Sequence, residues 1–433
     1  MTRTAFFRAS VSRASWAFAL ALAAMPAQAH ETQSDPRYGC RKQLSPPPGA
    51  MVTTLEERVA PLTFAPVVDG MVARFDLPTF DRYLRDVSGK NSVVIGGSSY
   101  TFTTRYSYST GGAKSWQYAY ERFQALGYQV RYQDYTHGSH ALKNIIATKT
   151  GTVTPSRVYV LCGHLDSTSE NANNQAPGAE DNGSGSAAVL AAAEVLKDEH
   201  FESTIEFVLF SGEEQGLYGS QAYVNEAVAQ GRDIRDAVNM DMISYTVDQY
   251  GVSIEGGHAW ATLMQAMADA VTYYTPLSYI YSYFSWGSDH VPFQDAGIPA
   301  ILAIDLDWDQ YPYYHSSGDT YARTNPGFAI LIGKATLATV AQMAGPIAPT
   351  TAVADGGARF RLFPNPTASR LSFAGSALDP SAVVRIIDAT GRELNQVSAH
   401  RTWDLRDAAG FAVPAGVYWA RLEGESRRVI VVR

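Results

Sequence analysis

Three short polar clusters in the middle of the chain carry the side chains that could do chemistry. They are residues 163–167 (GHLDS), 177–185 (PGAEDNGSG) and 211–219 (SGEEQGLYG). One neutral imidazole with several carboxylate oxygens suits a hard or borderline divalent metal such as zinc. The three clusters therefore predict a metal site.

The segments around these clusters predict how they are positioned. Apolar runs at 158–162 and 205–210 precede the first and third clusters, and an Ala-rich helical pattern covers 187–196. This order indicates strand, loop, helix and strand. Because the carboxyl ends of parallel strands meet at one edge of an α/β sheet, we expect the polar side chains to lie close together.

The remaining patterned segments extend this α/β alternation. We expect helices at 78–87, 114–126, 221–229, 260–271 and 325–343, with Gly111-Gly112 as a break before the second, and further strands at 128–132, 144–148, 237–240 and 300–304. Strands that alternate with helices favour a doubly wound, mostly parallel sheet with helices on both faces.

The composition bounds the class of protein. With 433 residues, 46% of them hydrophobic and 18% charged, the chain is globular and long enough for two folded units plus processing segments. The net charge is −8 and the basic residues form no stripe, so nucleic acid is not an expected partner.

The N-terminus has the features of a secretory signal. Arg3, Arg8 and Arg13 precede an apolar run at 16–25, which ends at the small-x-small sequence 27–29. We expect cleavage after Ala29, the alternative being a buried N-terminal helix. No segment is long enough for a membrane span. The expected location is extracellular, at the cell surface or in the periplasm.

The rest of the chain divides by composition. We assign 1–29 to the signal peptide, 30–74 to a Pro-rich extension or propeptide, 75–345 to the α/β domain, 346–358 to a linker and 359–433 to a small all-β sandwich. Export permits a disulfide between Cys40 and Cys162. However, Cys162 lies inside an apolar strand, which favours a buried free thiol.

A co-catalytic dinuclear site requires a bridging carboxylate, about two further ligands per metal and a free carboxylate as base. The candidates are His164, Asp181, Glu214, Asp241 and His315 as ligands, with Glu213 as base. Taken singly, Asp181 could be a helix cap and Glu213-Glu214 a solvated pair. Asp166 lies two residues after His164 in an extended segment, so it can hold the other ring nitrogen of that imidazole.

Five motifs in this order resemble the secreted zinc aminopeptidases of the bacterial leucyl aminopeptidase type, whose fold is shared by glutamate carboxypeptidases and glutaminyl cyclases. They are His164-x-Asp166, Asp181-x-x-Ser184-Gly185, Glu213-Glu214-x-Gly216-x-x-Gly219-Ser220, Asn239-x-Asp241-Met242 and His315-Ser316-x-x-Asp319-Thr320. The resemblance covers residues 75–344. It implies an exported enzyme that hydrolyses the N-terminal residue, expected to be hydrophobic, from peptide substrates.

The resemblance also implies roles for the site residues. One zinc ion would be bound by His164 and Asp241, and the other by Glu214 and His315, with Asp181 as the bridge. Glu213 matches the general base, and Asp166 matches the residue that orients His164. The residue before the last ligand, Tyr314, would either stabilise the oxyanion or form part of the pocket wall.

Several other residues remain ambiguous. The segment 288–290 (SDH) resembles one that lines the pocket, and we expect His290 to be structural. Aromatic residues could form either a hydrophobic substrate pocket or ordinary core: Phe284, Trp286, Trp308, Tyr311 and Tyr313. His137, His140, His258 and His400 lie outside any ligand pattern.

The C-terminal unit resembles the Ig-like sorting domains of type IX secretion at residues 362–366, 387–393 and 414–418. This implies the secretion machinery as a partner, the alternative being a passive β-domain. For the whole chain the alternatives are a carboxypeptidase or glutaminyl cyclase of the same fold, or a surface-binding protein with a decayed site. The intact ligand set argues against decay. The sequence leaves open the preferred residue and the oligomeric state.

Overall fold

The computed structural model describes residues 61–283, 285, 287–347, 361–363, 367, 370–374, 382–388, 391–399, 401–422 and 425–431. The predicted signal peptide, Cys40, most of the linker, Phe284, Trp286 and His400 lie outside the described residues. The assignments made for them stay predictions.

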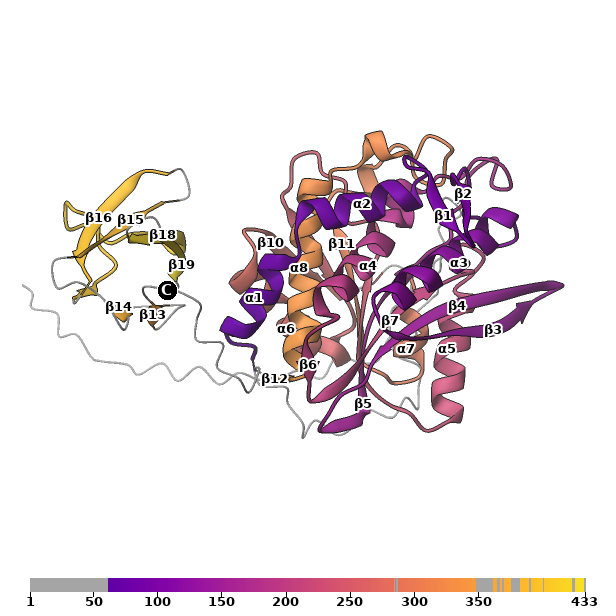
Figure 1. Cartoon of the computed structure of the whole chain (residues 1–433), viewed down its shortest axis with the longest axis horizontal. Coiled ribbons are helices and arrows are strands. Elements are labelled where there is room, and N and C mark those ends of the chain that lie inside the picture. The colour runs from indigo at the N-terminus through magenta and orange to yellow at the C-terminus, as the bar shows by residue number, and fades with distance from the viewer. Residues whose placement is uncertain are drawn as a thin grey trace, which may run out of the picture. The chain divides into compact units, whose positions relative to one another are not determined.

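An eight-stranded mixed sheet forms the centre of the α/β domain, in the order β10-β9-β11-β8-β5-β7-β4-β3 (Figure 1). Its four central strands run parallel: β11 (Ala300–Asp305), β8 (Asp233–Met240), β5 (Thr154–His164) and β7 (Ser203–Phe210). On one side β4 (His140–Lys149) and β3 (Gln129–His137) continue the sheet antiparallel. On the other side β9 (Gly251–Glu255) is antiparallel to β11, and β10 (Ser278–Ser282) is parallel to β9.

Helices cover both faces of this sheet, which confirms the predicted doubly wound α/β class. Along β5, Leu161 packs in one apolar cluster, while Val160 and Cys162 pack in another on the opposite face. The first cluster includes residues of α1 (Pro66–Arg74), α2 (Leu77–Val87), α3 (Thr110–Ala125), α4 (Gly185–Leu196), α6 (Ala261–Tyr274) and α8 (Pro326–Met343). The second includes residues of α5 (Tyr218–Ala229) and α7 (Val291–Asp295).

Short elements complete the domain. They are the hairpin of β1 (Val93–Ile95) and β2 (Ser98–Tyr100), the pair of β6 (His200–Phe201) and β12 (Pro346–Ile347), the π-helical turn η1 (Ala179–Ser184), and the 3-10 turns η2 (His258–Trp260), η3 (Trp308–Gln310) and η4 (Tyr321–Arg323). Within the described part of the chain, no helix combines the length and apolar character that crossing a membrane requires.

The boundaries of two helical segments differ from those expected from the sequence. Helix α1 belongs to the segment assigned to the extension, yet Val68, Met71 and Val72 are buried in the main core. Helix α3 begins at Thr110 and contains Gly111 and Gly112, which we expected to precede it. These glycines allow close packing, because a Cβ atom would lie 2.1 Å from the Thr104 carbonyl oxygen at Gly111 and 2.4 Å from that of Tyr106 at Gly112.

The strands β9 and β10 were not expected from the sequence. The segment that contains β10 is rich in tyrosine and partly exposed, so it lacks the continuous apolar run of a central strand. Its position at the edge of the sheet explains this composition.

The C-terminal unit is a small sandwich of antiparallel sheets, as predicted. One sheet contains β13 (Arg361–Phe363), β14 (Leu371–Ala374) and β17 (Thr402–Trp403), and the other contains β16 (Glu393–Ser398), β15 (Val383–Ile387), β18 (Gly416–Leu422) and β19 (Glu425–Val431). Its own apolar core includes Trp403, Leu371, Val384 and Ile386.

Candidate metal centre

The predicted ligands lie together at the carboxyl edge of the parallel strands. His164 is the last residue of β5, Asp241 follows β8 directly, and Glu213-Glu214 lie in the loop after β7. His315 lies in the loop that follows β11 and η3. The sheet topology therefore gathers residues that are far apart in the sequence, as expected for this edge of an α/β fold.

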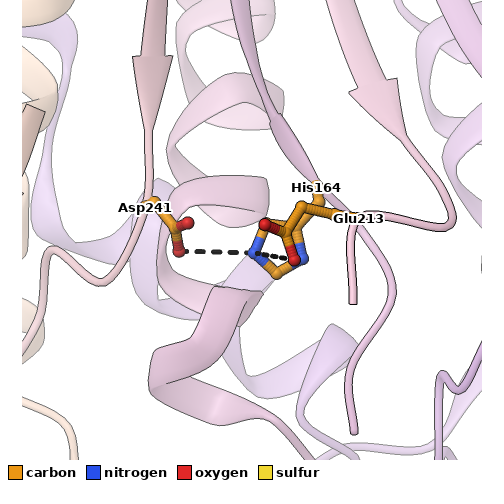
Figure 2. A group of neighbouring side chains, drawn as sticks. All are labelled: His164, Glu213 and Asp241. Atoms are coloured by element: carbon orange, nitrogen blue, oxygen red, sulfur yellow. Dashed lines mark hydrogen bonds and ion pairs between the residues drawn. The ribbon is translucent and has the colours of Figure 1, made fainter. Parts of the chain in front are cut away.

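His164 lies at the centre of one group of potential ligands (Figure 2). Its Nε2 atom is 3.3 Å from Oδ1 of Asp241 and 3.9 Å from Oε2 of Glu213. One ligand atom from each of these three residues lies within 4.8 Å of the others, a spacing at which they could hold one cation. Glu213 is therefore close enough to be either a ligand or a neighbouring base.

The two carboxylate oxygens of Asp181 face different histidines. Oδ1 lies 3.4 Å from Nε2 of His164, and Oδ2 lies 3.2 Å from Nε2 of His315. The same nitrogen of His315 lies 2.9 Å from Oε2 of Glu214. Asp181 thus lies between two groups of potential ligands, which is the arrangement that a bridging carboxylate requires.

Hydrogen bonds to Asp319 and to the Met240 carbonyl hold the loop that carries Asp181. The main-chain N–H groups of Glu180 and Asp181 donate to the two carboxylate oxygens of Asp319, at 2.9 and 3.0 Å. Tyr311 donates its hydroxyl proton to Oδ1 of Asp319 at 2.6 Å. The side chain of Asn182 donates to the Met240 carbonyl at 2.8 Å, and the Asp181–Asn182 peptide bond is cis. These hydrogen bonds connect the Asp181 loop to β8 and to the loop that carries His315 and Asp319.

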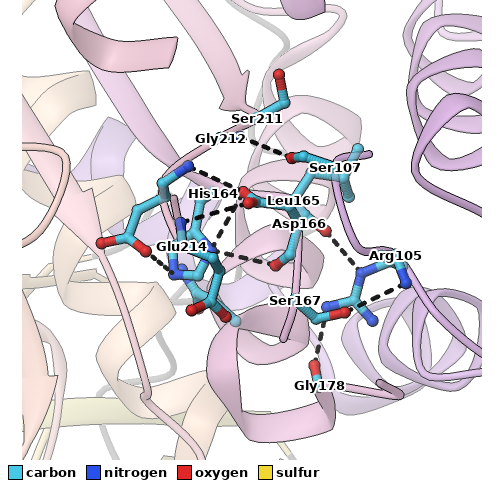
Figure 3. Close-up of polar contacts among 12 residues, drawn as sticks. Arg105, Ser107, His164, Leu165, Asp166, Ser167, Gly178, Ser211, Gly212 and Glu214 are labelled. Atoms are coloured by element: carbon cyan, nitrogen blue, oxygen red, sulfur yellow. Dashed lines mark hydrogen bonds and ion pairs between the residues drawn. The ribbon is translucent and has the colours of Figure 1, made fainter. Parts of the chain in front are cut away.

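Asp166 contacts both His164 and the Glu213–Glu214 loop (Figure 3). Nδ1 of His164 lies 3.2 Å from the main-chain carbonyl oxygen of Asp166 and 3.7 Å from its Oδ1. The main-chain carbonyl is therefore the nearer partner of the ring. The Asp166 carboxylate accepts instead the N–H groups of Glu213 and Glu214, at 3.3 and 3.4 Å.

The electrostatics of the site favour bound positive charge. Burial by itself would lower the pKa of His315, but Glu214 and Asp181 outweigh it and raise this pKa to about 11. Burial raises the pKa of Glu214 to about 7. Burial also raises the pKa of Glu213 well above its usual range, more than the nearby His164 lowers it. Carboxylates crowded in a buried site are stabilised by cations.

The donor set fits zinc. Two imidazoles and several carboxylates are the ligands that zinc takes in catalytic sites. Both carboxylate oxygens of Glu214 are buried and accept no hydrogen bond from the described residues, although Oε2 lies close to the His315 ring. Buried polar atoms normally have a hydrogen-bond partner, so the lack of a donor to either oxygen of Glu214 among the described residues points to a cation.

A pocket opens beside the cluster and has one apolar wall. Its lining includes the polar residues Asp181, Glu213, Asp241, Ser288 and His315 and the apolar or aromatic residues Met242, Leu302, Ile304, Trp308 and Tyr314. Of the aromatic residues singled out in the sequence, Trp308 and Tyr314 lie in this lining. Tyr311 and Tyr313 are not in the lining, but they pack in the apolar cluster that contains Met242, Leu302 and Ile304. Met242, Leu302 and Ile304 were missed, because apolar residues at strand ends are indistinguishable from ordinary core in a sequence.

The remaining histidines make other contacts. His290 is buried, its Nε2 atom is paired with the hydroxyl of Ser285, and burial lowers its pKa to about 3. His137 contacts Tyr108, and His258 stacks on Tyr283 with ring centroids 4.1 Å apart. Cys162 is a buried free thiol.

Comparison with known proteins relates this fold and site to a family. The model of peptidase family M28 matches residues 144–340. Leucine aminopeptidase 1 of Sclerotinia sclerotiorum is 30% identical over 269 residues, covering 56% of this chain and 68% of its own length. Leucine aminopeptidase 1 of Paracoccidioides brasiliensis (strain Pb03) is 28% identical over 266 residues, with the same two coverages.

Solved structures show the same fold. The LapA aminopeptidase of Legionella pneumophila aligns with a TM-score of 0.59 and 19% identity over 68% of this chain and 77% of its own. The zinc aminopeptidase BSAP of Bacillus subtilis aligns with a TM-score of 0.52 and 17% identity, and the alignment covers 63% of this chain and 96% of that protein. Together with the sequence matches, these findings make the chain a metallopeptidase. It belongs to peptidase family M28.

Proposed function

We propose that this chain is an exported aminopeptidase that uses a pair of zinc ions to remove a hydrophobic N-terminal residue from peptides. Zinc-dependent aminopeptidase activity agrees with the family and with the leucine aminopeptidases that the chain resembles. The observation that carries the dinuclear site is the position of Asp181, whose two oxygens face His164 and His315 separately.

The geometry supports a specific division of the ligands. His164 and Asp241 would hold one zinc ion, Glu214 and His315 the other, and Asp181 would contact both. When bound, zinc supplies Lewis-acid polarisation of the scissile carbonyl and makes a water molecule more acidic. The side chains of the proposed ligands are mostly buried, so the surrounding protein limits the access of bulk solvent to them.

Glu213 is proposed as the general base. Its side chain is buried but lines the pocket, where it would contact both a water molecule and a substrate. The raised pKa of Glu213 suits a group that accepts a proton from the attacking water and returns it to the leaving amine. Tyr314 also lines the pocket, where its hydroxyl would stabilise the developing oxyanion or its ring would form the wall.

The apolar wall of the pocket supports a preference for a hydrophobic N-terminal residue. Met242, Leu302 and Ile304 belong to one apolar cluster and line the same pocket as the carboxylates that would contact the reacting groups. A hydrophobic substrate side chain that packs against these three residues would bury apolar area, and this burial would favour hydrophobic N-terminal residues over polar ones. Export rests on the signal-like N-terminus, and a sorting role for the C-terminal sandwich rests on its sequence resemblance alone.

The test combines zinc content with substrate range for the purified mature protein. The proposal predicts two zinc ions per chain and cleavage of aminoacyl amides with hydrophobic residues. One zinc ion with cyclisation of N-terminal glutamine would identify a cyclase instead. Release of C-terminal residues would identify a carboxypeptidase. Protein without zinc or hydrolysis would identify a binding protein.

A further inference from the structure

Arg105 is a fully buried arginine that lies close to the predicted ligands in space but outside every motif (Figure 3). It belongs to the segment between β2 and α3. Its side chain has no exposed area, so it cannot contact a substrate. A buried guanidinium is costly unless its donors are satisfied, and its partners therefore indicate what it does.

The donors of Arg105 all reach main-chain carbonyl oxygens. Nε donates to Leu165 at 2.7 Å, one terminal nitrogen donates to Val87 at 2.8 Å and to Pro177, and the other donates to Gly178 at 2.8 Å. The guanidinium is planar and holds its donors in a fixed fork, so it sets the relative positions of these acceptors.

Three of these carbonyl groups belong to the two loops that carry the first ligands, and the fourth, Val87, is the last residue of α2. Leu165 lies between His164 and Asp166, while Pro177 and Gly178 lead into η1 and Asp181. Arg105 also donates its main-chain N–H to the Ser167 hydroxyl at 3.2 Å, and that hydroxyl donates to the Ala176 carbonyl at 2.6 Å. One residue therefore joins the His164 loop to the Asp181 loop.

Gly178 allows this close approach. It adopts φ of +52°, and a Cβ atom there would lie 2.4 Å from Cβ of Ser167 and 3.1 Å from a terminal nitrogen of Arg105. Any larger residue would separate the two loops or displace the guanidinium. The contact between the two loops and Arg105 therefore leaves no room for a side chain at position 178.

The charge of Arg105 is retained at this buried position. Burial lowers its pKa to about 10, and the surrounding carboxylates, foremost Asp319 and Asp166, limit the decrease. The side chain is therefore a cation at neutral pH. Among the described residues, its hydrogen-bond acceptors are carbonyl oxygens and not carboxylates, which distinguishes it from the surface arginines that form ion pairs.

We propose that Arg105 is a positioning residue that fixes the distance between His164 and Asp181, and thereby the affinity and geometry of the zinc site. The inference rests on the proposed dinuclear function. Both ligands face the same cation, so a small separation of their loops would lengthen a ligand bond at one of them. Outer partners of this kind are typically worth about 10–100-fold in metal affinity or activity.

The test uses Arg105→Lys and Arg105→Met in the full-length protein, with Arg232→Met as control. Arg232 is partly buried, and it contacts Glu206 and Tyr223 on the opposite face of the sheet. Zinc affinity is measured by competition with a chromogenic chelator, and site geometry by the absorption bands of the cobalt-substituted protein. Steady-state kinetics on an aminoacyl amide give kcat and KM.

Both Arg105 variants should bind zinc about tenfold or more weakly, because lysine keeps the charge but not the fork. Their cobalt bands should shift, and kcat should fall with KM little changed. Arg232→Met should lose thermal stability while its zinc affinity and cobalt bands stay at wild-type values. Wild-type zinc affinity and cobalt bands in Arg105→Lys, or equal losses of affinity in Arg232→Met, would overturn the inference. A wild-type protein that holds no zinc would overturn the proposed function itself.

Discussion

One carboxylate oxygen of Asp166 accepts the main-chain N–H of Glu213 at 3.3 Å and lies 3.7 Å from Nδ1 of His164. The other oxygen accepts the N–H of Glu214 at 3.4 Å. Asp166 therefore connects the proposed base, Glu213, with the proposed ligands His164 and Glu214. Its carboxylate holds the main chain that carries Glu213 and Glu214, while its main-chain carbonyl is the nearer partner of the His164 ring.

Replacement of Asp166 by asparagine should disturb both connections. An amide places a donor where the carboxylate accepts an N–H, so the Glu213–Glu214 loop should shift. We expect kcat/KM to fall by about 10–100-fold, as for other outer partners of metal ligands. Kinetics and zinc content of Asp166→Asn check this. Wild-type kcat/KM with wild-type zinc content would show that Asp166 positions neither group.

Glu213→Gln should keep both zinc ions and lose most of kcat. Removal of a general base typically costs about 10²–10⁴-fold, and glutamine cannot take up the proton. Zinc content and kcat of the purified variant are the measurements. Since Glu213 lies near His164 and Asp241, a ligand role is the specific alternative. Loss of one zinc ion in Glu213→Gln would establish that alternative, and activity close to wild type would exclude both roles.

Asp181→Asn should weaken both zinc ions together, whereas Glu214→Gln should weaken chiefly the ion shared with His315. The reason is that Asp181 lies within ion-pair distance of both histidines, whereas Glu214 lies within that distance, 2.9 Å, of His315. Stepwise removal of zinc by a chelator measures the two affinities. Full occupancy in Asp181→Asn, or the same loss in both variants, would contradict the assignment.

The metal-free protein should show a stabilising contribution of His315 that depends on pH. The folded pKa of about 11 lies above the value of about 6.5 in an unfolded chain. His315 therefore contributes its full stabilisation below about pH 6.5 and loses it as the pH rises toward 11. Urea unfolding of zinc-free wild type and His315→Gln should show a larger difference in free energy at about pH 6 than at about pH 10. A constant difference would mean that the pKa of His315 is not raised.

Truncation at about Gly356 should leave a folded, zinc-binding peptidase with close to full activity on small amides. The carboxylates and imidazoles of the site all precede Asp319, and the sandwich has a separate apolar core. If the sandwich sorts the protein, the truncated form should lose delivery. Secreted fraction and melting temperature of the two forms are compared. Normal secretion with a large fall in melting temperature would contradict the sorting role and favour a stabilising one.

The α/β fold was accessible from the sequence because its central strands are continuous apolar runs. The segments before His164 and Glu213 are buried on both faces, and such strands have a strong signal. The edge strand β10 lacked that signal, since a half-exposed strand of tyrosine and serine resembles a loop. The glycines of α3 were placed outside the helix for a similar reason, because only tertiary packing against Thr104 and Tyr106 explains them.

The ligand candidates could be chosen from the sequence because each belongs to a recognisable motif, and all but His315 lie at the end of a strand or before a helix. Arg105 could not, since its partners are carbonyl groups of Val87, Leu165, Pro177 and Gly178, and carbonyl groups carry no sequence signature. Main-chain acceptors can be assigned only when the fold is known. The same limit applies to the choice between the carbonyl and the carboxylate of Asp166 as the partner of His164.

The bonds from Glu180 and Asp181 to Asp319 also bear on the order of folding. They join residues 139 and 138 positions apart in the chain. Contacts at such separations form late, because a long loop must first be closed. Asp181 can thus reach its final position only after β11 has joined the sheet and the loop that follows it has formed. A chain that has not folded as far as Asp319 would lack the proposed zinc site, so metal capture should mark the end of folding and not its beginning.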